Sequence, residues 1–287
     1  MSVKVDKVEF KSEIGVGKIN EDACGYKENT FWVLDGATGL NKRNLSDDIS
    51  DAHWYTNWWD KYLNDNSFKD INLKDIMYKG IKKVDDDYQK FCVGKKVEKI
   101  DFPSASITII RVNDEKLEYF ILGDCRLYID DGCKVQIIHD DSVSKLDNNI
   151  FNAMLDMEDF YSIDLSESLS ILSEQIIENR MKNNCDDGYW ILSFDEKAID
   201  KAKYGIIDIE KDIRIMIASD GYYSYSDKYR LIEEDLLIDE TFKYGIDIMI
   251  NQIRNFEDDK DRIRRIPRFK DKDDCTCLCI NIEKINE

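Results

Sequence analysis

Aspartate recurs in this chain at positions where an apolar segment meets a turn, and side chains placed in this way can hold a metal ion. The acidic segments are Asn20-Glu21-Asp22, Asp35-Gly36, Gly123-Asp124, Ser219-Asp220-Gly221 and Asp273-Asp274. A single Asp-Gly pair is ordinarily a turn, because both residue types fit tight turns for local reasons. Three of these segments adjoin strongly apolar strands, however, so their carboxylates should project from a rigid edge of the core. The combination indicates a site.

Mg²⁺ and Mn²⁺ are the ions that such a set of side chains suits. They take oxygen ligands in octahedral geometry and keep several waters, so a few aspartates and one backbone carbonyl suffice for each ion. The glycine after Asp35 leaves room for a carbonyl to turn toward an ion. His53 and His139 are the only histidines, which excludes a zinc site made of several histidines. Any catalysis therefore depends on carboxylates.

The elements expected to position these aspartates are apolar strands and amphipathic helices. The predicted strands span 3–11, 31–34, 106–112, 117–123, 126–130, 134–138, 213–218 and a last segment that begins at Cys275. The four strands between 106 and 138 are expected to form one antiparallel meander. The predicted helices span 47–64, 71–91 and 235–255. No linker marks a domain boundary, and helices mixed with antiparallel strands predict packed sheets covered by helices.

Composition narrows the possible partners and the compartment. The 287 residues are 43% hydrophobic and 35% charged, with a formal net charge of −19. Nucleic acid is not expected as a partner, since that field repels it. The same field disfavours a phosphorylated substrate unless bound cations receive the phosphate. No apolar run is long enough to cross a membrane and no export signal is present, so no membrane partner and a cytoplasmic location are expected.

The eight cysteines are expected to be reduced thiols, because they are scattered singly through a chain without an export signal. Cys275, Cys277 and Cys279 alternate, so on a strand they share one face and act as small hydrophobic residues. A thiolate metal site at these three residues is the alternative. The basic run 262–272 is interpreted as a solvated loop, with phosphate steering as the alternative.

Six segments, taken in order, resemble the successive motifs of the type 2C protein phosphatases, a family of metal-dependent Ser/Thr phosphatases. They are NEDA at 20–23, VLDGATG at 33–39, PSASITII at 103–110, GDCRLY at 123–128, IASDGYY at 217–223 and DDCT at 273–276. The resemblance spans nearly the whole chain and is to the bacterial members. It implies an α+β fold: a central sandwich of two antiparallel sheets flanked by helices. It also implies one catalytic domain over 1–287, with 143–190 as a variable flap.

The resemblance also implies a role for each matching residue. Asp35 corresponds to the aspartate that bridges two metal ions, and the carbonyl of Gly36 to a ligand of one of them. Asp220 and Asp273 correspond to the other direct ligands. The residues implied to act through coordinated water or at a weaker third ion are Glu21, Asp22 and Asp124. The expected activity is hydrolysis of phosphoserine and phosphothreonine in proteins by a water shared between two Mn²⁺ or Mg²⁺ ions.

Two positions depart from the motifs. Gly17 stands where family members commonly carry an arginine that grips the substrate phosphate, and the adjacent Lys18 is the candidate replacement. As a point charge it cannot reproduce the two-pronged hydrogen bonding of arginine. Ala37 stands where some members have a histidine proposed to protonate the leaving group. Without it, protonation falls to metal-bound water.

These departures keep two alternatives open: a degenerate homologue that binds metal or a partner without turnover, and a phosphatase of a small phosphorylated metabolite. A haloacid-dehalogenase type of phosphatase is disfavoured, because Asp35-Gly36-Ala37 lacks a second aspartate two residues on. An EF-hand is disfavoured because the acidic segments lack its alternating ligands. As partners, the resemblance implies a phosphorylated protein substrate and a cognate Ser/Thr kinase in signalling, with the chain as a monomer.

Overall fold

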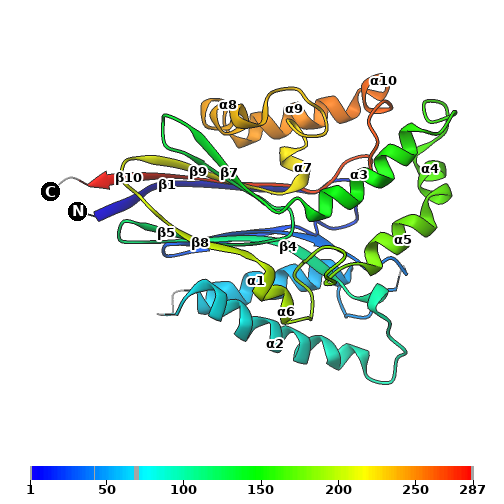
Figure 1. Cartoon of the computed structure of the whole chain (residues 1–287), viewed down its shortest axis with the longest axis horizontal. Helices are drawn as coiled ribbons and strands as arrows, with labels where there is room; N and C mark the ends of the chain where they lie inside the picture. The colour runs from blue at the N-terminus through cyan, green and yellow to red at the C-terminus, as the bar shows by residue number, and fades with distance from the viewer. Residues whose placement is uncertain (1, 42, 68–70, 286–287) are drawn as a thin grey trace.

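Two five-stranded antiparallel sheets form the centre of the fold in the computed structural model, which describes residues 2–41, 43–67 and 71–285. The sheets lie face to face with helices outside both of them (Figure 1). The β1 sheet has the order β1 (Ser2–Glu13), β10 (Cys275–Ile285), β9 (Ile213–Ala218), β6 (Arg126–Asp130), β7 (Val135–Ile138). The β3 sheet has the order β2 (Ala23–Lys27), β3 (Thr30–Ala37), β4 (Ser104–Asn113), β5 (Lys116–Leu122), β8 (Lys203–Asp208). The predicted α+β sandwich is confirmed.

The sandwich is held together by branched aliphatic side chains on the two facing surfaces. Val33 and Ile110 from the β3 sheet belong to the same buried cluster as Ile215, Leu278 and Ile280 from the β1 sheet. Because side chains alternate across a strand, the opposite faces of the same strands pack against helices. Burying both faces of each sheet makes the central strands rigid supports for whatever projects from their ends.

Helices cover both outer faces (Figure 1). On the β3 sheet, α1 (Asp51–Asn66) and α2 (Leu73–Cys92) pack with Trp59, and Trp54 and Trp58 lie against the same cluster, as predicted. On the β1 sheet lie α7 (Asp220–Tyr223), α8 (Leu237–Tyr244) and α9 (Ile246–Asp258). The buried face of β10 toward these helices carries Cys275, Cys277 and Cys279, so the prediction that they share one face is confirmed. The short elements α6 (Lys197–Lys201), α10 (Lys260–Ile263), η1 (Lys99–Asp101) and η2 (Glu234–Leu236) complete the connections.

The segment predicted as a flap forms α3 (Ser142–Leu155), α4 (Leu165–Ile171) and α5 (Ser173–Met181). These helices extend away from one end of the sandwich (Figure 1). Their small core is built around Ile150, Met154 and Phe160, and α5 contributes no fully buried residue to it. The flap segment therefore has far less apolar support than the sandwich.

Two predictions of elements are wrong in detail. The helix predicted over 235–255 is two helices, since Gly245 has φ of 89° and ends α8 before α9 begins. The four strands from 106 to 138 are not one meander, because β4 and β5 pair in one sheet while β6 and β7 pair in the other. Strands β2 and β8 were not predicted. No described helix is both long enough and apolar enough to cross a membrane.

Candidate metal centre

Asp35 lies at the end of β3 in the middle of the acidic cluster. It is opposite Ser106 of β4 in the register of the β3 sheet, so its position is set by a central strand. Gly36 follows at a place where the backbone of β3 passes very close to the backbone at Glu21. A Cβ built on Gly36 would lie 2.4 Å from the carbonyl oxygen of Glu21, so only glycine fits there. The β1 sheet contributes through Asp220, whose N–H lies 3.5 Å from Oδ2 of Asp35.

Asp220 and Asp273 approach the same place from neighbouring strands of the β1 sheet. Asp220 begins α7, directly after β9, and Asp273 precedes β10, which pairs with β9. The carbonyl of Asp273 accepts a hydrogen bond from Nη2 of Arg254 on α9, at 2.9 Å. The two segments also touch directly, since a Cβ on Gly221 would lie 2.0 Å from the carbonyl oxygen of Asp274.

The remaining predicted residues surround these three. Asp124 accepts a hydrogen bond from the hydroxyl of Ser106, and its own N–H donates to Oγ of Ser106 at 3.2 Å. Asp22 is 8% exposed and accepts from Oγ of Ser219 at 2.9 Å. Glu21 accepts from Oγ1 of Thr38 at 2.7 Å.

The aspartates of the cluster influence one another's pKa values. Burial raises the pKa of Asp35 well above its usual range, and the charges of its neighbours raise it further. Those neighbours are Asp22, Asp220, Asp124 and Asp273. The pKa values of Asp22, Asp124 and Asp273 are also raised, in each case by burial first and by a nearby aspartate as well. Like charges held together in this way favour either protons or cations.

Two lysines partly balance the negative charge of the aspartate cluster. Nζ of Lys228 lies 2.8 Å from Oδ2 of Asp220, and Nζ of Lys270 lies 2.7 Å from Oδ1 of Asp273. Burial acts to raise the pKa of Asp220, but Lys228, with Lys270, holds that pKa below its usual range. Burial acts to lower the pKa of Lys228, but Asp220 and Asp273 together raise it above its usual range. Both groups of this pair are therefore charged.

The donor set fits Mn²⁺ or Mg²⁺ in chemistry and in location. Asp35, Asp220, Asp273 and the Gly36 carbonyl are hard oxygen donors gathered at one end of the sandwich. Within the described ranges, no three His, Cys, Asp or Glu side chains already converge as metal ligands. What the structure has instead are the ion pairs of Asp220 and Asp273 with lysine. Each carboxylate pairs with its lysine through one oxygen, Oδ2 of Asp220 and Oδ1 of Asp273, which leaves its other oxygen to hold an ion.

The predicted phosphate-binding residue makes no described hydrogen bond or ion pair with this cluster. Lys18 is exposed, and its side chain makes no hydrogen bond or ion pair with a described residue. Gly17 beside it is also exposed. Ala37 ends β3, and its carbonyl accepts a hydrogen bond from Nη2 of Arg180 on α5, at 3.2 Å. The same nitrogen donates to the carbonyl of Thr38 at 2.9 Å, so the flap segment touches the loop that follows Asp35.

Two residues at this centre, Lys228 and Lys270, were not singled out by the sequence, and Asp274 was named there only as part of the Asp273-Asp274 segment, without a role of its own. Asp274 accepts from the N–H of Gly15 and from that of Glu21, both at 2.7 Å, and so holds the 14–22 segment against β10. Lys270 lies within the basic run 262–272, which was the only signal for it. No pattern indicated Lys228, which follows α7 in an irregular segment.

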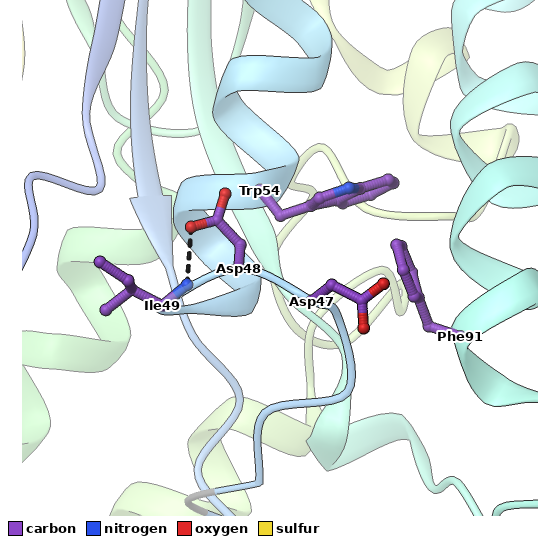
Figure 2. Close-up of a pocket in the computed structure, with 5 residues that line it drawn as sticks. All are labelled: Asp47, Asp48, Ile49, Trp54 and Phe91. Atoms are coloured by element: carbon purple, nitrogen blue, oxygen red, sulfur yellow. Dashed lines mark hydrogen bonds between the residues drawn. The ribbon is translucent and has the colours of Figure 1, made fainter.

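A recess on the described surface lies elsewhere. It has a volume of about 440 Å³ and is lined by Asp47, Asp48, Ile49, Trp54 and Phe91. Figure 2 shows the rings of Trp54 and Phe91 on one side of it and the hydrogen bond from the N–H of Ile49 to Asp48. None of the predicted metal ligands lines it.

Comparison with known proteins gives the fold. No protein-family model matches the chain. No curated protein matches it either. Among solved structures, the catalytic domain of the serine/threonine protein phosphatase PstP in complex with two manganese ions is 11% identical, with 99% of each chain covered and a TM-score of 0.55. The Mycobacterium tuberculosis serine/threonine phosphatase PstP/Ppp is 14% identical over 99% of this chain and 100% of the other, with a TM-score of 0.58. PppA, described as a key regulatory component of T6SS in Pseudomonas aeruginosa, is 13% identical over 98% and 99%, with a TM-score of 0.56. The chain shares the fold of these phosphatases along its whole length.

Proposed function

We propose that this chain is a metal-dependent phosphatase of the type 2C kind, which hydrolyses phosphoserine and phosphothreonine in proteins. The observation that carries the proposal is the aspartate cluster around Asp35, in which Asp22, Asp124, Asp220 and Asp273 all act on its carboxyl group. So many partly buried carboxylates in one place are costly without cations. The similar fold of known serine/threonine phosphatases supports the same activity.

In this proposal Asp35, Asp220, Asp273 and the Gly36 carbonyl would hold two Mn²⁺ or Mg²⁺ ions, with Asp35 common to both. Glu21 and Asp22 would orient coordinated water, and Asp124 with Asp220 would hold a weaker third ion. When bound, the ions supply an activated water and neutralise the phosphate charge. Ala37 has no proton to give, so no side chain at that position protonates the leaving group. Lys18 adds a point charge at the rim for the phosphate.

The remaining parts of the proposal concern the setting of the reaction. The chain forms one catalytic domain over 1–287, with 143–190 as a flap that borders the site. The hydrogen bond from Arg180 of the flap to the carbonyl of Thr38 supports that role. The substrate is a phosphoprotein that a cognate Ser/Thr kinase produces in the cytoplasm, and the enzyme acts as a monomer.

The test is hydrolysis of p-nitrophenyl phosphate and of a phosphoserine and phosphothreonine peptide panel, with Mn²⁺ or with a chelator. We expect activity with Mn²⁺, none with the chelator, and loss of activity in Asp220→Asn. No activity in a folded protein that binds Mn²⁺ would favour the degenerate homologue instead. Activity on small phosphoesters without activity on any peptide would favour the metabolite phosphatase. Full activity in Asp220→Asn would overturn the metal assignment.

A further inference from the structure

Lys228 and Lys270 come from two separate loops and meet at the acidic cluster. Lys228 lies in the segment between α7 and η2, and Lys270 in the segment between α10 and β10. Each contacts a carboxylate assigned above as a direct metal ligand, Lys228 contacting Asp220 and Lys270 contacting Asp273. The lysine side chains are 24% and 45% exposed respectively.

A small recess of about 20 Å³ lies between the two lysines. The charged side chains in its lining are Lys228, Arg268, Lys270 and Asp273. Three of these side chains are cationic and one is anionic, which is the reverse of the balance over the whole chain. Nε of Arg268 is buried without a hydrogen-bond acceptor among the described residues. The recess has room for about one water, so an anion larger than water would bind at its mouth.

The ammonium groups also have unused hydrogen-bond donors. A lysine ammonium carries three N–H donors. Within the part of the chain that the structure describes, Lys228 donates one hydrogen bond, to Asp220, and Lys270 donates one, to Asp273. Each can therefore remain beside its carboxylate and still donate to a phosphate oxygen.

The net charge of the centre explains why positively charged donors are needed there. The five aspartates of the cluster carry one more negative charge than two divalent cations can neutralise. A phosphate ester brings nearly two further negative charges at neutral pH. Lys228 and Lys270 reverse the sign of the centre, and they do so beside the carboxylates that would hold the ions. Gly17 offers no charge, and Lys18 makes no described contact with the cluster.

We propose that Lys228 and Lys270 together bind the phosphate group of the substrate. This inference rests on the proposed function, because it concerns the same centre. It names the side chains that recognise the phosphate there, whichever protein or small molecule carries the phosphate.

The test is calorimetric titration of the full chain with inorganic phosphate, at saturating Mn²⁺ and again with a chelator. Lys228→Met and Lys270→Met remove the charge and keep a long side chain, and we expect each to weaken phosphate binding about tenfold at saturating Mn²⁺. The double variant should weaken it further, and Lys228→Arg should restore most of the affinity. Turnover assays should show the loss mainly in KM.

The matched control is Lys272→Met. Lys272 belongs to the same loop as Lys270, but its ammonium group pairs with Asp258 at 2.6 Å. We expect its phosphate affinity to change by less than about twofold, because its charge is paired with Asp258 and not with a carboxylate of the cluster. Melting curves and Mn²⁺ titrations of every variant separate loss of phosphate binding from misfolding and from loss of metal.

Three results would overturn the inference. Phosphate affinity in the double variant could equal that of wild type while Mn²⁺ still binds. Lys272→Met could weaken binding as much as Lys270→Met does. The lysine variants could bind Mn²⁺ more tightly with no change for phosphate, which would make the lysines competitors of the metal only. A wild-type chain that hydrolyses no phosphoester but binds phosphate through these lysines would refute the proposed function and leave this inference standing.

Discussion

The carboxylates and the lysines of the candidate centre are held by different kinds of structure. Asp35 belongs to a central strand, and Ser106 on the adjacent strand both faces it in register and hydrogen-bonds Asp124. Lys228 and Lys270 lie in segments without regular structure, and their side chains reach the cluster through flexible methylene chains. The strands fix the positions at which ions can bind, whereas the positions of the lysines depend on loops and on their ion pairs with Asp220 and Asp273. Substitutions in the two sets should therefore have different consequences.

The largest loss of activity is expected from substitution of the carboxylates that the strands position. Asp35→Asn should lower Mn²⁺-dependent hydrolysis at least about a thousandfold, because it removes the bridging charge on which both ions depend. Initial rates on p-nitrophenyl phosphate measure this. Asp47→Asn, at the recess of Figure 2, is the control and should keep wild-type rates. Comparable losses in both variants would show that the cluster has no special role.

The next largest effect is a loss of stability on removing Asp274, which hydrogen-bonds the 14–22 segment. Asp274→Ala removes the acceptor for the N–H groups of Gly15 and Glu21 and should lower the free energy of unfolding by roughly 2–5 kcal/mol. Asp274→Asn keeps one oxygen acceptor and should lose about half as much. Urea denaturation of the metal-free protein gives both values. Equal midpoints for Asp274→Ala and wild type would mean that the 14–22 segment is held by other contacts.

The flap segment adds a carboxylate whose effect depends on pH. Burial, and then the charge of Asp124, raises the pKa of Asp147 on α3 from 3.8 to about 7. The folded state then holds a proton that the unfolded state releases, so this group's contribution to stability falls as pH rises from about 4 to about 7. The raised pKa values of Asp22, Asp35, Asp124 and Asp273 act in the same direction.

Asp147→Asn tests this dependence. In the presence of a chelator, this substitution should raise the free energy of unfolding by about 1–3 kcal/mol at pH 8 and leave it unchanged at pH 4. Urea denaturation at the two pH values measures this. Saturating Mn²⁺ should reduce the loss of wild-type stability at pH 8, since bound cations favour ionised carboxylates. A metal-free protein that becomes more stable between pH 5 and pH 8 would contradict the electrostatics of the cluster.

The smallest effect is expected at Lys18. Because it is exposed and makes no described ion pair, Lys18→Ala should raise KM by only about two- to threefold. Lys228→Met assayed in parallel should raise it about tenfold. A larger effect at Lys18 than at Lys228 would move the phosphate site from the lysine pair to the 14–19 segment.

The difference between residues on strands and residues on loops also explains what the sequence could predict. Short apolar runs predict strands such as β3 and β9. The aspartates at the ends of these strands were predicted from the acidic segments that follow the apolar runs and from the family resemblance. The break at Gly245 was missed because the apolar spacing continues across it. The split between β5 and β6 was missed because alternation does not say which sheet a strand joins. The position of Lys228, and the hydrogen bonds that Asp274 accepts from Gly15 and Glu21, depend on contacts between segments distant in sequence, which no local pattern encodes.

Counting the bound ions tests the central claim most directly. Calorimetric titration of the chain with Mn²⁺ should show two ions bound per wild-type chain, with a weaker third at higher concentration, and should show that Asp35→Asn loses the two tight ions while its circular dichroism spectrum is unchanged. A wild-type chain that binds no Mn²⁺, or an Asp35→Asn chain that binds it as tightly as wild type, would contradict the account.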